Sequence, residues 1–217
     1  MNSGALGQSP VKTGTTTIAV MCRDGIILGA DKRATAGSMI VGKDMDKILL
    51  VSDSIAITTA GLVSDIQLLA KLSRAEIKLQ EVQTLRRILV KEAANLLAGM
   101  QYRNIRYPSM VAGIVGFIMG GVDQEGLHIY EIGIDGSLTE VKEFTSDGSG
   151  SIFAIGVLED SYKKGMSVPE GIELVRSALN VALLRDSATG NGYKIMTITK
   201  DGIKTVVDEA INTGIRK

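Results

Sequence analysis

The sequence is poor in the residues on which many common active sites depend. Its 217 residues include one cysteine, Cys22, and one histidine, His128. A single cysteine excludes an intramolecular disulfide and a zinc site built from several cysteines. Cys22 lies in an apolar run, which indicates a small core residue rather than a reactive thiol. His128 lies mid-strand in "GLHIYEIG" with no catalytic motif around it, so the sequence gives little support to a Ser-His-Asp or Cys-His active site.

Aromatic residues, net charge and long apolar runs are scarce too. Aromatic residues make up 4% of the chain, tryptophan is absent, and 24 basic residues balance 24 acidic ones. This composition argues against a nucleic-acid partner, which needs a basic surface or stacking aromatics. The most apolar stretch, 110–122, is shorter than the roughly 20 residues that span a bilayer. Residues 1–14 lack the features of a secretory signal or transit peptide. We therefore expect a soluble, cytoplasmic protein that binds neither nucleic acid nor membrane.

The remaining composition supports one substantial folded domain, since 45% of the residues are hydrophobic and 22% are charged. Periodicities of two and of 3.6 residues alternate along the chain in blocks. Strands are predicted over 16–22, 25–31, 47–61 (as a hairpin), 110–122, 126–134, 138–144, 193–200 and 202–207. Helices are predicted from an N-cap at Ser64, from Thr84, over 152–164, from the capping box Ser167–Glu170 and, as a short segment, after Asp208.

The order of these elements is strands, two helices, strands, two helices, strands. Because the helices come in pairs rather than one after each strand, a doubly wound parallel sheet is disfavoured. Two helix pairs that cover two largely antiparallel sheets give an α+β fold, a four-layer α-β-β-α sandwich.

The stretch "KTGTTTIAV" at 12–20 carries the first chemical signal. Threonines are common in strands, so an ordinary strand edge explains the pattern. A cut between Gly14 and Thr15 would instead make Thr15 an N-terminus, whose amine could serve as the base for its own hydroxyl. That arrangement needs no histidine. Gly14 would then supply the conformational freedom for a strained backbone at the cut.

Other polar residues lie near predicted strand ends, each with a structural alternative. Asp31 and Arg33 in "GADKRAT" share one face, and Lys47 opens a strand; an ammonium beside Thr15 would lower the pKa of its hydroxyl, whereas a solvated charge cluster is the alternative. Gly61 is an oxyanion donor or a turn glycine. The last group would hydrogen-bond an N-terminal amine, or occupy an N-cap region and a helix C-terminal turn: Ser149, Asp186 and Thr189.

Taken together, "GTTTIAV … GADKRAT … DKILLV … TTAGLVSDIQLLAK … DGSGSIFAIGVLED … RDSATG" resembles the β-subunits of the 20S proteasome, most closely the archaeal type, from Thr15 to near the end of the chain. The resemblance implies the N-terminal-nucleophile hydrolase fold and a threonine-type endopeptidase that uses no metal or cofactor. It implies a propeptide, residues 1–14, removed by autocatalysis, and a single catalytic domain over 15–217.

The resemblance also implies roles for individual residues. Thr15 matches the nucleophile, Asp31 and Lys47 the adjoining carboxylate–lysine pair, Arg33 a structural arginine and Gly61 the oxyanion donor. Ser149, Asp186 and Thr189 match residues around the nucleophile's amine, although the last position is more usually serine. The primary specificity pocket matches small or apolar positions without a carboxylate, which predicts cleavage after hydrophobic residues: Ala34, Met45, Leu49, Thr59 and Val63.

The family's assembly predicts the partners. These are other β-subunits in a heptameric ring, α-subunit rings that cap two stacked β-rings, a regulatory ATPase that acts through the α-ring, and unfolded polypeptide substrates. Two alternatives remain open. One is an unprocessed structural β-subunit, although such subunits usually lose the Gly–Thr junction or the lysine, and this chain keeps Gly14–Thr15 and Lys47. The other is an amidase of the same fold that acts on a small molecule.

Overall fold

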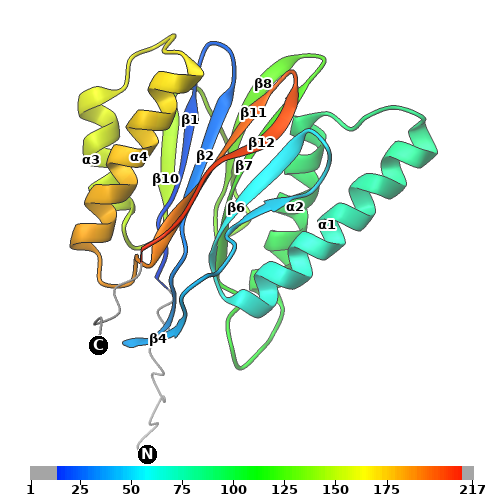
Figure 1. The fold of residues 1–217 in the computed structure, drawn as a ribbon. Helices are drawn as coiled ribbons and strands as arrows, with labels where there is room; N and C mark the ends of the chain where they lie inside the picture. The colour runs from blue at the N-terminus through cyan, green and yellow to red at the C-terminus, as the bar shows by residue number, and fades with distance from the viewer. Residues whose placement is uncertain (1–13, 212–217) are drawn as a thin grey trace, which may run out of the picture.

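Two five-stranded antiparallel sheets pack face to face, and a pair of helices covers the outer face of each (Figure 1). The computed structural model describes residues 14–211. The predicted leader therefore lies outside the described residues, except for Gly14. The observed layer order is α-β-β-α, which confirms the α+β sandwich predicted from the order of the elements.

The first sheet has the strand order β10-β1-β2-β11-β12. In that order its strands are Phe144–Asp147, Thr17–Met21, Ile26–Asp31, Gly192–Thr199 and Gly202–Ala210. Two helices, α3 (Ser151–Ser161) and α4 (Val168–Arg185), cover its outer face. The capping box predicted at the start of α4 is present, because the backbone N–H of Ser167 donates to Glu170 Oε2 at 2.7 Å.

The second sheet runs β5-β6-β7-β8-β9 and is covered by α1 (Val63–Thr84) and α2 (Val90–Arg106). In that order its strands are Ile48–Leu50, Ile55–Gly61, Val115–Asp123, Gly126–Ile132 and Leu138–Val141. A small hairpin, β3 (Ala34–Ala36) and β4 (Met39–Gly42), lies at the lower edge of the molecule in Figure 1.

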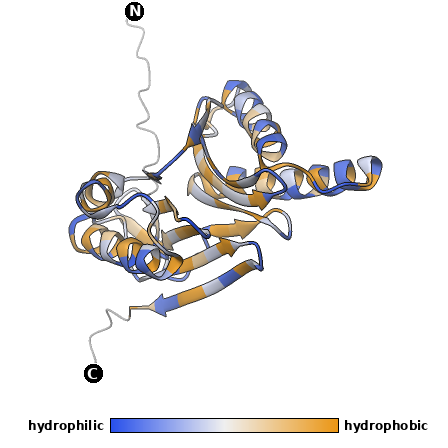
Figure 2. Ribbon diagram, turned by 90° about the horizontal axis from the view of Figure 1, so that it is seen from above, coloured by the Kyte–Doolittle hydropathy of each residue, from blue (hydrophilic) through white to orange (hydrophobic). Residues whose placement is uncertain are grey.

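Alternation along the strands divides the apolar residues among three layers of core. In β1, Ile18 and Val20 pack under α3 and α4, whereas Ala19 faces the second sheet. In β7, Phe117 packs under α1 and α2, and Ile118 lies between the sheets. Both faces of the central strands are therefore buried, and apolar residues concentrate between the helix layers (Figure 2). Such strands appear in a sequence as nearly continuous apolar runs.

Several predicted boundaries are wrong. The first helix begins at Val63 with Leu62 as its N-cap rather than Ser64. Thr84 is its last residue rather than the start of a second helix, because Leu85 takes the left-handed conformation (φ 54°) that ends it. The strand predicted from residue 110 begins at Val115. Strand β12 continues through Asp208 to Ala210, so the short helix predicted after Asp208 does not begin there, and residues 212–217, over which it would continue, lie outside the described residues.

Candidate active site

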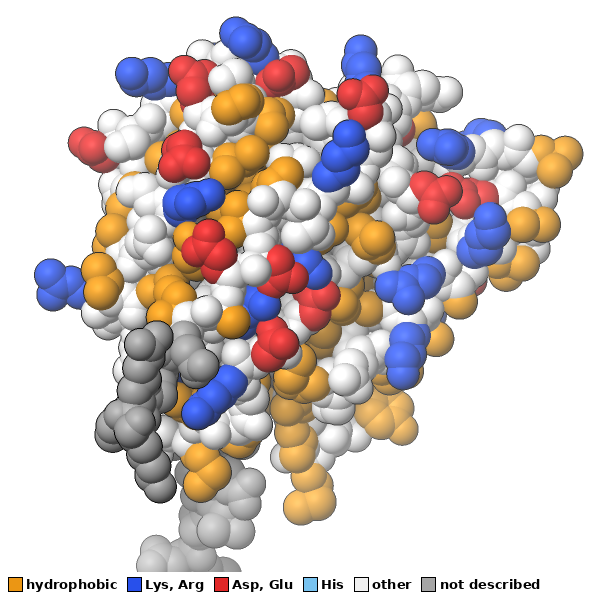
Figure 3. Space-filling model, in the orientation of Figure 1, with side chains coloured by type: hydrophobic (Ala, Val, Ile, Leu, Met, Phe, Trp, Pro, Cys, Tyr) orange, Lys and Arg blue, Asp and Glu red, His pale blue; other side chains and the backbone are white. Residues whose placement is uncertain are grey.

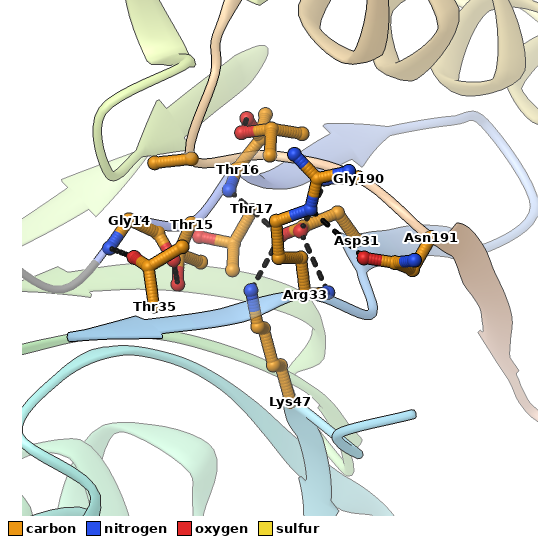
Figure 4. Close-up of polar contacts among 12 residues, drawn as sticks. Gly14, Thr15, Thr16, Thr17, Asp31, Arg33, Thr35, Lys47, Gly190 and Asn191 are labelled. Atoms are coloured by element: carbon orange, nitrogen blue, oxygen red, sulfur yellow. Dashed lines mark hydrogen bonds and ion pairs between the residues drawn. The ribbon is translucent and has the colours of Figure 1, made fainter. Parts of the chain in front are cut away.

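Thr15 lies just before β1, at the point where the first sheet meets the β3–β4 hairpin (Figure 4). Its side chain is buried, with 4% of the residue exposed. In the uncut chain the nitrogen of Thr15 is an amide that stands in for the amine a cleavage would release. The Thr15 hydroxyl donates a hydrogen bond to the carbonyl oxygen of Gly14 at 2.6 Å. The hydroxyl thus lies directly beside the bond whose cleavage the sequence predicts.

Asp31 ends β2 and accepts four hydrogen bonds. Its Oδ1 receives the backbone N–H of Thr16 at 3.0 Å and the Lys47 ammonium at 2.6 Å. Its Oδ2 receives the N–H groups of Arg33 and Gly190, each at 3.0 Å. Because every lone-pair direction of the buried carboxylate is used, Asp31 fixes the start of β1, the β2–β3 junction and the loop before β11 relative to one another.

Lys47 precedes β5 and reaches across from the second sheet to Asp31 (Figure 4). It is 6% exposed, and its partner is 1% exposed. Burial lowers the pKa of the Lys47 ammonium, and the charge of Asp31 opposes that change only in part. Lys47 therefore gives up its proton more readily than a lysine in water. The solvated charge cluster considered as an alternative does not fit this burial.

Three polar residues, Ser149, Asp186 and Thr189, form a hydrogen-bonded group that meets the nitrogen of Thr15 at Ser149. The amide N–H of Thr15 donates to Ser149 Oγ at 3.3 Å. Ser149 Oγ in turn donates to Asp186 Oδ2 at 2.6 Å, and Thr189 Oγ1 donates to the same oxygen at 2.5 Å. Asp186 is also the C-cap of α4. Ser149 directly precedes Gly150, the N-cap of α3. The helix-end positions considered as alternatives therefore do not exclude the polar group, because the same residues take part in both.

Arg33 holds the loop that carries Asp186 and Thr189. Its Nε donates to Asn191 Oδ1 at 2.8 Å and its Nη1 to the carbonyl oxygen of Ser187 at 2.7 Å. This geometry fits a structural arginine. Lys32 points the other way, as the alternation predicts, and pairs with Asp44 at 2.9 Å and with Asp208.

The two glycines singled out from the sequence are glycine for different reasons. A Cβ at Gly14 would lie 1.8 Å from the Cβ of Ala188, so no side chain fits there. The backbone freedom expected of Gly14 at the cut stays a prediction, because its φ angle involves residue 13, which lies outside the described residues. Gly61 has φ 129°, and a Cβ there would lie 2.2 Å from the carbonyl oxygen of Ile114.

A cavity of about 360 Å³ opens beside Thr15, and Gly14, Lys47 and Gly61 line it as well. All five predicted pocket residues lie on its wall, namely Ala34, Met45, Leu49, Thr59 and Val63. Two larger hollows, of about 690 and 790 Å³, contain none of the predicted site residues. Of these three cavities, the 360 Å³ cavity is therefore the one in which a bound ligand would contact the candidate nucleophile.

Sequence reasoning missed several residues of this cavity. Thr35 accepts the N–H of Gly14 at 2.8 Å, and the exposed hairpin strand β4 contributes Val41. Asp46 also lies on the wall, although the sequence predicts a pocket without a carboxylate. Its carboxylate pairs with Lys194 at 2.8 Å. Strand patterns do not reveal Thr35 and Val41, because β3 and β4 have three and four residues.

The chain is similar to known proteins over most of its length. The pattern of the family described as "Proteasome subunit" matches residues 11–198. The chain belongs to the proteasome subunit family. A proteasome subunit beta of Archaeoglobus profundus is 40% identical over 205 residues, 94% of each chain. Others include one from Methanosphaerula palustris, 40% identical over 95% of this chain and 96% of its own, and one from Methanocaldococcus jannaschii, 41% identical over 93% and 88%.

The surface carries charges of both signs. Figure 3 shows acidic and basic side chains interspersed on one face, with apolar side chains gathered at its lower edge. Among residues 14–211, no helix is both long and apolar enough to cross a bilayer. The family match and the two antiparallel sheets agree with the architecture expected from the sequence.

Proposed function

We propose that this proteasome-family chain is a catalytic β-subunit and a threonine-type endopeptidase whose nucleophile is Thr15. The observation that carries the proposal is the Thr15 hydroxyl, 2.6 Å from the Gly14 carbonyl oxygen and on the wall of the apolar cavity. The Asp31–Lys47 pair supports it from one side, and the Ser149–Asp186–Thr189 group from the other.

The first reaction in this proposal removes residues 1–14. The Thr15 oxygen attacks the Gly14 carbonyl carbon, a C–O bond forms, and the C–N bond to Thr15 breaks, which leaves an ester and a free amine. Water then hydrolyses the ester, and Gly14 departs as a carboxylate while Thr15 regains its hydroxyl. Gly61 lines the same cavity, and in this proposal its N–H donates to the developing oxyanion.

The same groups then serve substrate peptides. The Thr15 oxygen attacks the peptide carbonyl, and the Thr15 amine accepts the hydroxyl proton and passes it to the leaving amine. Water releases the acyl-enzyme. In this proposal the charged form of Lys47 lowers the pKa of the hydroxyl, while Asp31 holds that ammonium in place. The apolar cavity wall favours hydrophobic side chains before the cleaved bond, since Lys194 already neutralises Asp46.

The relatives are named as proteasome subunits beta, which supports assembly with other subunits. We propose heptameric β-rings stacked between α-rings, in the cytoplasm, with unfolded polypeptides as substrates and an ATPase that acts through the α-ring. Enclosure would keep an unselective nucleophile away from folded proteins.

Thr15→Ala in the assembled particle tests the proposal, with Thr15→Ser as the matched variant that keeps a hydroxyl. Intact mass reports removal of residues 1–14, and a fluorogenic peptide reports hydrolysis. We expect Thr15→Ala to lose both and Thr15→Ser to retain part of both. Survival of both in Thr15→Ala refutes the proposal. A wild-type particle that keeps residues 1–14 and hydrolyses no peptide would establish the structural alternative.

A further inference from the structure

The hydroxyl of Thr16 has no place in the mechanism above, yet it is fully buried beside the candidate site. Its Oγ1 lies 2.7 Å from Thr189 Oγ1. Thr189 is 1% exposed and donates to Asp186 Oδ2. The Thr16 hydroxyl is therefore one step removed from the carboxylate that also holds Ser149.

The carboxylate of Asp186 fixes the direction of these hydrogen bonds. An ionised carboxylate only accepts, and each hydroxyl has a single hydrogen to donate. Thr189 gives its hydrogen to Asp186, so its oxygen can only accept from Thr16. Ser149 gives its single hydrogen to Asp186 at 2.6 Å in preference to the carbonyl oxygen of Thr15 at 3.4 Å, so its oxygen accepts from the N–H of Thr15.

Two arms thus converge on Asp186. One starts at the nitrogen of Thr15 and passes through Ser149, and the other starts at the side chain of Thr16 and passes through Thr189. Because Thr15 and Thr16 are joined covalently, the two arms form a closed ring. The backbone N–H of Thr16 is held independently by Asp31 at 3.0 Å, so this residue is tied to both halves of the site (Figure 4).

We propose that Thr16 is a positioning residue that orients the Thr15 nitrogen through the Thr189–Asp186–Ser149 group. This inference rests on the proposed function, in which that nitrogen becomes the catalytic amine. Thr16 does not line the 360 Å³ cavity and acts only through its neighbours. Its loss should therefore affect turnover rather than peptide binding.

The packing around the two hydroxyls supports a specific contact. A Cβ at Gly150 would lie 2.0 Å from Thr16 Oγ1 and 3.0 Å from Thr189 Oγ1. No residue with a side chain fits at position 150 while the hydroxyls stay together. The second glycine of "DGSGS" is therefore explained by this contact as well as by its place at the start of α3.

Three variants of the full chain test the role of Thr16. Thr16→Val removes the hydroxyl at nearly constant volume, and Thr16→Ser keeps the hydroxyl. Thr17→Val is the matched control, because Thr17 is an adjacent buried threonine whose hydroxyl donates only a long bond, 3.4 Å, to the carbonyl oxygen of Asp147. Intact mass gives the number of processed sites, and peptide hydrolysis gives kcat per processed site and KM.

We expect Thr16→Val to lower kcat by about three- to tenfold, as loss of one net hydrogen bond implies, with KM within about twofold of wild type. Thr16→Ser should restore kcat, and Thr17→Val should leave it unchanged. If Thr16→Val does not assemble, Thr16→Ala replaces it, since it only removes atoms. An unchanged kcat without the hydroxyl, or an equal loss in Thr17→Val, overturns this inference. A wild-type particle without peptidase activity would instead refute the proposed function.

Discussion

The fit of Gly14 against Ala188 leads to a prediction that separates processing from catalysis. Gly14→Ala adds one methyl group to the residue before the proposed cut. Mature chains lack residue 14 in the proposed mechanism. The substitution should therefore slow the removal of the leader and leave the activity of every processed site unchanged.

The magnitude follows from the packing. The new Cβ would lie 1.8 Å from the Cβ of Ala188 and 2.9 Å from its Cα, whereas carbons in contact stay about 3.5–4.0 Å apart. Relief requires a shift of roughly 2 Å, shared between Gly14 and the loop of Ala188, with an overpacking cost of about 1–3 kcal/mol. A 1 Å misplacement of reacting groups can cost on the order of 100-fold in rate. We expect processing to slow by about 10- to 100-fold.

Intact-mass measurement over time, from mixing of the subunits, gives the rate at which the precursor disappears. Ala188→Gly is the control, and we expect it to process at close to the wild-type rate. The double variant Gly14→Ala/Ala188→Gly should recover part of the rate, because the 2.9 Å contact with the Cα remains. Processing of Gly14→Ala at the wild-type rate, or a double variant no faster than Gly14→Ala, would show that this contact does not govern the cut.

Three further predictions concern the centre of the site, its cavity and the lone cysteine. Asp31→Ala leaves the Lys47 ammonium and three backbone N–H groups without their acceptor, so we expect it to lower the free energy of unfolding by about 3–5 kcal/mol. We expect Lys47→Met to lower the free energy of unfolding by less, because those three N–H groups keep their acceptor. Urea unfolding followed by circular dichroism measures the free energy of unfolding of both variants, and equal decreases would contradict the role assigned to the three N–H groups. Peptides with Leu or Tyr before the bond should be hydrolysed faster than those with Arg or Glu; the reverse order would exclude a hydrophobic specificity pocket. Burial, with the charges of Asp24 and Glu170, raises the pKa of Cys22 to about 12. The thiol should resist alkylation at pH 8 until the chain is unfolded, and rapid reaction of the native protein would contradict its burial.

Element order and layer order were predictable from the sequence because each depends on long, periodic segments. The buried face of α1, with Leu69, Ala70, Ser73 and Ile77, repeats at helical spacing. The end of that helix was not predictable in the same way. Leu85 is apolar and fits the same periodicity, yet it is 92% exposed in a left-handed turn. Hydrophobic spacing carries no information about which apolar residue ends a helix.

The candidate site likewise has features that the sequence could predict and features that it could not. A resemblance that runs over most of the chain located Thr15, Asp31 and Lys47 without any geometry. Spacing could not show that Asp46 reaches the cavity wall, because its position depends on an ion pair with Lys194, 148 residues away. Nor could spacing show why residue 14 is glycine, since the reason is contact with Ala188 on a distant loop.

The three threonines of "GTTT" acquire distinct roles from the alternation of one strand. The ladder continues just before β1, because the carbonyl oxygen of Thr16 accepts the N–H of Asp31. Thr16 therefore shares a face with Ile18, which packs beneath α3 and α4, and its hydroxyl meets Thr189 in the loop after α4. Thr15 is on the opposite face, toward the second sheet, which supplies Leu49, Thr59 and Gly61 to the cavity. One period of two residues thus turns the proposed nucleophile toward its substrate and the next hydroxyl toward the groups that hold its nitrogen.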